Sequence, residues 1–188
     1  MRPKSNWYHR SKSILRKSRY ALQSSVLVVI VQFCLHCSVQ AQHFGDKCVG
    51  TWEGTMHIYN NGSLTDSVPV RLSVSALSSS SWKWTTEYLS PTLPMVKDYI
   101  LKLVDAKTGK YVTDEGNGIE LNDYLFGNKL YCVFEVSGIL LTSSYELIED
   151  KLIFEVTSGK KDVSKSDEIE TYATSNLQRV VFRRLKKD

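Results

Sequence analysis

The feature of this sequence that most constrains its fold is a regular alternation of apolar and polar residues. Within residues 50–59, Trp52, Met56 and Ile58 share one side of an extended chain, and polar side chains occupy the other. A period of two residues is typical of a β-strand with one buried face. The Asn-Asn-Gly-Ser segment at 60–63 tolerates positive φ, so it predicts a tight hairpin after this strand.

The same alternation recurs in about ten short segments, with turn residues every eight to twelve positions. Serines at 78–81 and prolines within 90–94 separate some of these segments. The polar tract 158–176 is expected to be a solvated loop, and no helix is expected outside residues 160–173. Short strands with hairpin-length turns predict an all-β sandwich or barrel. We favour a single antiparallel up-and-down β-barrel of 8–10 strands, because closure removes exposed edges.

Barrel strands alternate between inward and outward side chains, so the face that carries most apolar residues should point inward. This rule assigns twelve residues to the interior: Trp52, Met56, Ile58, Val70, Leu72, Val74, Leu101, Leu103, Leu130, Phe134, Leu152 and Phe154.

The first 41 residues have a different composition from the remainder. They hold seven Lys and Arg residues and no acidic residue, and an apolar run at 26–35 follows the basic part. Val39 and Ala41 then form a small-x-small site, a pattern that predicts a secretory signal peptide over 1–41. The apolar run is shorter than the roughly 20 residues of a spanning helix, although an uncleaved anchor is the alternative. The chain is therefore expected to be exported, to a periplasm or out of the cell.

Removal of the leader reverses the net charge of the protein. The whole chain carries +4, but 7 of its 24 basic residues lie in the leader. Residues 42–188 keep 17 basic and 20 acidic residues, a net charge of −3, which gives no reason to expect nucleic acid as a partner. These 147 residues suit one barrel domain, with no stable membrane span after cleavage. The sequence sets no oligomeric state.

The start of the first strand, Gly-Thr-Trp at 50–52, resembles that of the lipocalins and the wider calycin group. In that group the tryptophan plugs one end of the barrel, and an arginine near the end of the last strand commonly packs across the indole. The last strand here offers Arg179, Arg183 and Arg184. A guanidinium stacks favourably on an indole face. The resemblance implies a calycin-like barrel closed by Gly50, Trp52 and Arg183.

The cysteine count leaves one pair in the expected mature chain. Cys34 and Cys37 lie in the leader, and Cys48 and Cys132 remain. Exported proteins fold in an oxidising compartment, where disulfides persist. The spacing is compatible both with a Cys48–Cys132 disulfide and with two separate buried thiols.

Residues that carry catalysis or bind metals are sparse in the expected mature chain. His43 and His57 lack the neighbours of a metal site and are expected on the surface. No Gly-x-Ser-x-Gly nucleophile motif occurs. The acidic pairs at 114–115 and at Glu120 and Asp123 are adjacent to glycines and are interpreted as turn residues. We therefore expect no catalytic residue, no metal and no cofactor.

Aromatic residues are the strongest indication of a binding site. Trp82, Trp84 and Tyr88 share one face of a strand, while Lys83 and Glu87 on the opposite face prefer water. The aromatic face should therefore point inward and line a cavity. A core filled by these rings and an outward aromatic strip are the alternatives. The candidate ligand-binding residues are Trp82, Trp84, Tyr88 and Met56.

The leading functional hypothesis is an exported calycin-like barrel that binds a small apolar or amphipathic molecule without catalysis. The alternative is an envelope or secreted interaction module with a filled barrel, and an enzyme is the third option. The volume of the interior distinguishes the first two, because ligand pockets usually measure roughly 300–1,000 Å³.

Overall fold

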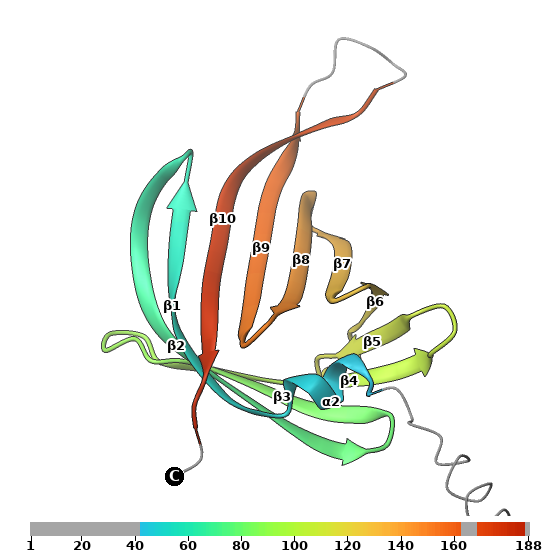
Figure 1. Ribbon diagram of the computed structural model, residues 1–188. Coiled ribbons are helices and arrows are strands. Elements are labelled where there is room, and N and C mark those ends of the chain that lie inside the picture. Colours follow the sequence, from blue (N-terminus) through green and yellow to red (C-terminus); the bar gives the residue numbers. More distant parts are fainter. Residues whose placement is uncertain (1–41, 163–168, 187–188) are drawn as a thin grey trace, which may run out of the picture. The chain divides into compact units, whose positions relative to one another are not determined.

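The computed structural model of the chain describes residues 42–162 and 169–186. Ten strands form one closed antiparallel barrel, in which each strand pairs with its neighbours in sequence and the last pairs with the first (Figure 1). A short helix precedes the first strand. The elements are α2 (Phe44–Cys48), β1 (Gly50–Asn60), β2 (Ser63–Ser78), β3 (Ser81–Tyr88), β4 (Met95–Asp105), β5 (Lys110–Asp114), β6 (Glu120–Phe126), β7 (Lys129–Val136), β8 (Ile139–Ile148), β9 (Lys151–Asp162) and β10 (Thr171–Arg184).

The alternating pattern predicted this architecture correctly. The fold is a barrel and not a sandwich, because β10 pairs with β1 and closes the sheet. The pair β1–β10 places Trp52 opposite Arg184 and Met56 opposite Val180. The tight turn after β1 uses Asn61 at φ 49° and Gly62 at φ 80°. Positive φ at both central residues is the requirement of the two-residue hairpin turn that Asn-Gly favours.

Two segments differ from the sequence-based expectation. The polar tract 158–176 was expected to be a loop, but β9 continues to Asp162 and β10 begins at Thr171. The backbones of these strands pair, for example at Ala173 and Lys160, and such pairing does not depend on apolar side chains. The polar composition therefore led to the wrong assignment of this segment as a loop. The helix α2 was not expected, because five residues are too short to show a helical period.

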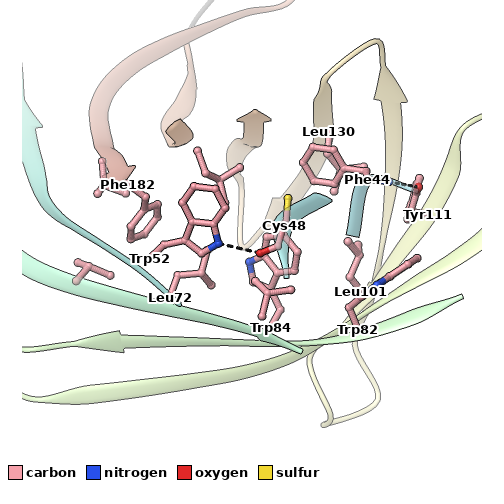
Figure 2. Packing of buried hydrophobic residues seen from close by; sticks show 14 of the residues in the cluster. Phe44, Cys48, Trp52, Leu72, Trp82, Trp84, Leu101, Tyr111, Leu130 and Phe182 are labelled. Carbon is pink, nitrogen blue, oxygen red and sulfur yellow. Dashed lines mark hydrogen bonds between the residues drawn. The ribbon is translucent and has the colours of Figure 1, made fainter. Parts of the chain in front are cut away.

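The twelve residues assigned to the interior all face it. Eleven belong to the apolar cluster inside the barrel, and Phe134 lines the cavity described below. Figure 2 shows part of this cluster, with Trp52, Trp84, Trp82 and Phe44 among its large side chains. Trp52, Leu72 and Leu152 are fully buried.

The predicted signal peptide and its cleavage site end at Ala41, outside the described residues. Within the described ranges, none of the helices is long and apolar enough to cross a membrane.

Cys48 and Cys132 are free, buried thiols in the described chain. The structure therefore has the second of the two arrangements compatible with the sequence. Cys48 lies in α2, whereas Cys132 lies in β7 and faces the cavity. Burial raises the pKa of each thiol to about 12, so both stay protonated and unreactive near neutral pH.

Candidate ligand-binding site

The barrel contains a partly open cavity of about 140 Å³. Its described lining comes from β3 to β9 and the β5–β6 loop. Most lining side chains are apolar or aromatic, and a smaller polar group lies among them. The lining residues are Trp84, Tyr99, Leu101, Thr113, Glu115, Leu121, Asp123, Leu130, Cys132, Phe134, Ser143, Ser144, Tyr145, Phe154 and Val156.

A row of contacting aromatic rings runs from α2 into the cavity. Phe44 stacks on Trp84 with the ring centroids 6.4 Å apart. Trp84 meets Tyr145 edge to face at 5.1 Å, and Tyr145 stacks on Phe154 at 4.4 Å. Such pairs fix ring orientation beyond what apolar burial alone would do. Trp84 therefore forms the part of the cavity wall that adjoins the helix.

The indole nitrogen of Trp84 is a buried donor without an acceptor. The residue is 3% exposed, and Nε1 has no hydrogen-bond partner among the described residues. The hydroxyl of Tyr145 lies near this N–H. Burial raises the pKa of Tyr145, and the nearby N–H partly opposes that rise. The two groups nevertheless do not have the geometry of a hydrogen bond. A buried donor left unpaired costs about 1–3 kcal/mol, so this position requires an explanation.

Asp123 is the buried carboxyl group of the cavity wall. It is 5% exposed, and its Oδ2 accepts a hydrogen bond of 2.8 Å from Thr113 Oγ1. Burial raises its pKa from the ordinary 3.8 to about 6, and the hydrogen bonds from Thr113 only partly oppose this rise. Near neutral pH the group is therefore mainly ionised in an apolar setting, which costs free energy unless a cation accompanies it.

Other polar groups of the cavity gather near Asp123. Cys132 lies opposite Asp123 in the β6–β7 pair and opposite Ser143 in the β7–β8 pair. Burial is the main cause of the raised pKa of Cys132, and the negative charges of Asp123 and Glu115 add to it. Burial and the charge of Glu115 likewise raise the pKa of Tyr99 to about 12. Within the described chain, no cluster of three His, Cys, Asp or Glu side chains is placed to hold a metal ion.

Trp52 lies at the closed end of the barrel, together with α2. Its Nε1 donates a hydrogen bond of 2.8 Å to the backbone oxygen of Cys48 (Figure 2). The cation over its ring is Arg184, with Cζ 4.0 Å from the ring centroid, and Arg184 Nη2 also donates to the oxygen of Lys47 at 2.6 Å. Gly50 has φ 134°, a conformation that residues with a side chain rarely adopt, and a Cβ there would lie 2.8 Å from Arg184 Nη1, so this position favours glycine.

The assignment of Arg183 to barrel closure was therefore wrong. In the β1–β10 register, Trp52 is opposite Arg184, whereas Arg183 is opposite Glu53. Residues that are directly opposite in a sheet share a face, so Arg184 lies on the side of the indole and Arg183 on the outer side.

Trp82 also belongs to the closed end and does not line the cavity. Its Nε1 donates a hydrogen bond of 2.9 Å to Asp46 Oδ1 in α2. Gly45 approaches the ring so closely that a Cβ there would lie 2.1 Å from it. Trp82 therefore anchors the helix, although the sequence placed it with Trp84 in the ligand site.

Of the four candidate ligand-binding residues, only Trp84 lines the cavity. Met56 is buried in the core on β1, which contributes no described residue to the lining. Tyr88 is half-buried against the core at the end of β3, and burial raises its pKa. The inward direction of the aromatic face was predicted correctly, but alternation alone does not give the depth at which each ring lies.

Asp123 is the residue that the sequence analysis missed. It was interpreted as a turn residue, yet it lies in the middle of β6. The pattern Leu121-x-Asp123-x-Leu125 places the carboxyl on the same strand face as two leucines, and this periodicity could have identified an inward acidic residue.

Comparison with known proteins shows that this chain resembles solved structures in its fold. No family model and no curated protein matches the chain. The S-type phycobiliprotein lyase CPES from Guillardia theta has a similar structure, with a TM-score of 0.58 at 9% identity, over 77% of this chain and 92% of that one. The wild-type fluorescent protein UnaG has a TM-score of 0.42 at 20% identity, over 74% and 98%. The siderocalin Ex-FABP has a TM-score of 0.31 at 12% identity, over 73% and 69%. The barrel is calycin-like, in agreement with the resemblance noted at residues 50–52.

Proposed function

We propose that this protein binds a small, mainly apolar molecule inside its barrel, without chemistry. The observation that carries the proposal is a cavity of about 140 Å³ whose wall holds the unpaired indole N–H of Trp84. Binding pockets typically combine apolar walls with a few polar groups that orient the ligand. Here Trp84 supplies a donor and Asp123 an acceptor. The calycin-like fold is compatible with this role but does not identify the ligand.

The size of the cavity limits the ligand. Pockets for drug-sized molecules measure about 300–1,000 Å³, whereas an apolar cavity of about 150 Å³ can take up benzene. The volume found here is below the several hundred Å³ that the sequence analysis took as the mark of a ligand pocket, yet the interior is not filled. We therefore propose a ligand of about one ring, or a longer ligand that inserts one ring-sized end.

Fluorobenzene followed by ¹⁹F NMR tests this proposal. The wild-type chain should shift and broaden the fluorine signal in a saturable way, because the probe enters the cavity. Val156→Phe, in the cavity wall, should abolish the effect by filling the space. Val133→Phe is the matched control, since Val133 is 62% exposed on the outer face of β7 and should leave binding intact.

An interaction module remains the second candidate, because one outer surface is apolar. Tyr124, Phe126, Tyr131 and Val133 on β6 and β7 are all at least 40% exposed, and Phe126 meets Tyr131 edge to face at 6.2 Å. Clustered exposed apolar residues often mark an interaction surface. If the wild-type chain leaves the fluorine signal unchanged, the ligand proposal fails and the module takes its place.

Export is a further part of the proposal. The basic start, the apolar run at 26–35 and the small residues Val39 and Ala41 support cleavage before Gln42. N-terminal sequencing of exported protein should give a chain that begins at Gln42. Exported protein that begins at Met1, or retention in the membrane, would contradict this part without affecting the cavity.

A further inference from the structure

We infer that the ligand of this cavity is an organic cation: an ammonium group on an apolar body of about one ring, paired with Asp123. This inference rests on the proposed function and specifies its ligand class. Two independent features support it, the charges of the cavity wall and its aromatic composition.

The charges of the cavity are unbalanced. Its lining includes two carboxyl groups, Asp123 and Glu115, and among the residues that the structure describes no Lys, Arg or His lines it. Neither carboxylate forms an ion pair within the described ranges. A buried carboxylate that has a hydrogen bond but no opposite charge still costs free energy, and a cationic ligand would supply that charge.

The outside of the same barrel shows the contrasting arrangement. Glu53 pairs with Arg71 at 2.7 Å, and Glu155 pairs with Arg179 at 2.7 Å. These acidic residues are partly exposed, where pairing matters least for stability. Carboxylates that water could solvate are thus paired with cationic side chains, whereas Asp123, which is 5% exposed, has no such pair among the described residues.

The aromatic walls suit a cation as well as an apolar body. Trp84, Tyr99, Phe134, Tyr145 and Phe154 all line the cavity. Aromatic faces attract ammonium groups, and the attraction strengthens where water is excluded. A carboxylate or sulfonate ligand would instead meet two like charges, so the same wall disfavours anionic ligands.

The pH dependence of such binding should follow Asp123. In register with it lie Tyr111 on β5 and Cys132 on β7, and Tyr99, Glu115 and Tyr145 share the cavity. Burial raises the pKa of each of these tyrosines and of Cys132, so these four groups stay uncharged near pH 6. The carboxyl groups then set the charge of the cavity. Since the pKa of Asp123 is about 6, protonation below that pH should weaken the binding of a cation.

Three probes with one ring and different charges test the inference by calorimetry on the full-length chain. Benzylamine is the cation, benzyl alcohol the neutral probe and benzoate the anion. At pH 7.5 benzylamine should bind at least about tenfold more tightly than benzyl alcohol, as expected for one charge-assisted hydrogen bond. Benzoate should bind most weakly. From about pH 7 to pH 5 the preference for benzylamine should decline, a measurement that needs no variant.

Asp123→Asn should remove the preference for benzylamine, with far-ultraviolet circular dichroism verifying that the variant is folded. Glu155→Gln is the matched control, because this outer carboxylate already has Arg179 and lies outside the cavity lining. It should leave the preference intact. Equal or tighter binding of benzyl alcohol or benzoate, or a preference that survives in folded Asp123→Asn, overturns the inference while the binding proposal stands. If none of the three probes binds, both fail.

Discussion

The interior of the barrel differs between the side formed by β10, β1 and β2 and the side formed by β3 to β9. On the first side Trp52, Met56, Leu72 and Phe182 are buried in the apolar core, and none of the described residues that line the cavity comes from these strands. On the second side the described lining of the cavity includes Asp123 and other polar groups. The first side stabilises the barrel, because its large side chains are buried and its one indole, that of Trp52, has a hydrogen-bond partner.

The three buried indoles make the difference concrete. Trp52 donates to the oxygen of Cys48 and Trp82 to Asp46, whereas the donor of Trp84 has no partner in the described chain. Buried polar groups are nearly always paired in folded proteins, and exceptions tend to mark functional positions. The contrast therefore separates the closed end, to which Trp82 on β3 also belongs and where both indoles are paired, from the cavity, whose wall holds an unpaired indole donor.

The largest expected effect is at the closed end. Trp52→Ala should lower the free energy of unfolding by about 3–5 kcal/mol, because a fully buried aromatic side chain is lost. Urea denaturation measures this change. Phe126→Ala is the control, since Phe126 is 65% exposed and should stay within about 0.5 kcal/mol of the wild type. A loss below about 1 kcal/mol for Trp52→Ala would mean that the indole does not close the barrel.

The next effect concerns the cavity and depends on pH. Between about pH 4 and pH 6, Asp123 is protonated in the folded protein but ionised in the unfolded chain, since its folded pKa is raised from 3.8 to about 6. The folded state then binds more protons, so this group makes the free energy of unfolding fall as the pH rises through the window. The loss is complete above pH 6 and amounts to about 3 kcal/mol at most.

Asp123→Asn should therefore be more stable than the wild type at pH 7. Its free energy of unfolding should not show the decrease between about pH 4 and pH 6 that Asp123 causes in the wild type. Urea denaturation at a series of pH values, without ligand, measures the difference. Asp98→Asn is the control, because a hydrogen bond from Thr85 lowers the pKa of that exposed carboxyl and the fall should persist. An Asp123→Asn variant that is less stable than the wild type at pH 7 would indicate that the carboxylate is paired in solution.

The fold could be predicted from the sequence because a barrel repeats one simple rule. Period-two alternation and turn residues located about ten strands, and the apolar residues gave the inward face of six of them: β1, β2, β3, β4, β7 and β9. The same rule placed Trp52 and Trp84 inside. Applied to the last strand, it would also have chosen Arg184, which shares parity with the buried Val180 and Phe182.

The rest of the site depends on tertiary positions, such as where α2 packs, and the alternation of apolar residues gives no information about them. Trp82 and Trp84 are two residues apart on one face, yet α2 covers the first and the cavity borders the second. The position of α2 is a tertiary property of five residues with no visible period. The separation of Cys48 from Cys132 likewise depends on which elements carry them, and sequence spacing does not determine that distance.

The smallest expected effect tests the contrast between the indoles directly. Trp52→Phe and Trp84→Phe remove similar volumes, but only the first also leaves a backbone oxygen, that of Cys48, without its donor. Trp84→Phe should therefore destabilise the protein by about 1 kcal/mol less than Trp52→Phe, the net value of a typical hydrogen bond. Urea denaturation of the two variants without ligand measures the difference, and Trp82→Phe should behave like Trp52→Phe because it loses the bond to Asp46. If Trp84→Phe costs as much as the other two, its indole is hydrogen-bonded in the free protein. The cavity would then offer a ligand no unpaired donor, and the main support for the binding proposal would be lost.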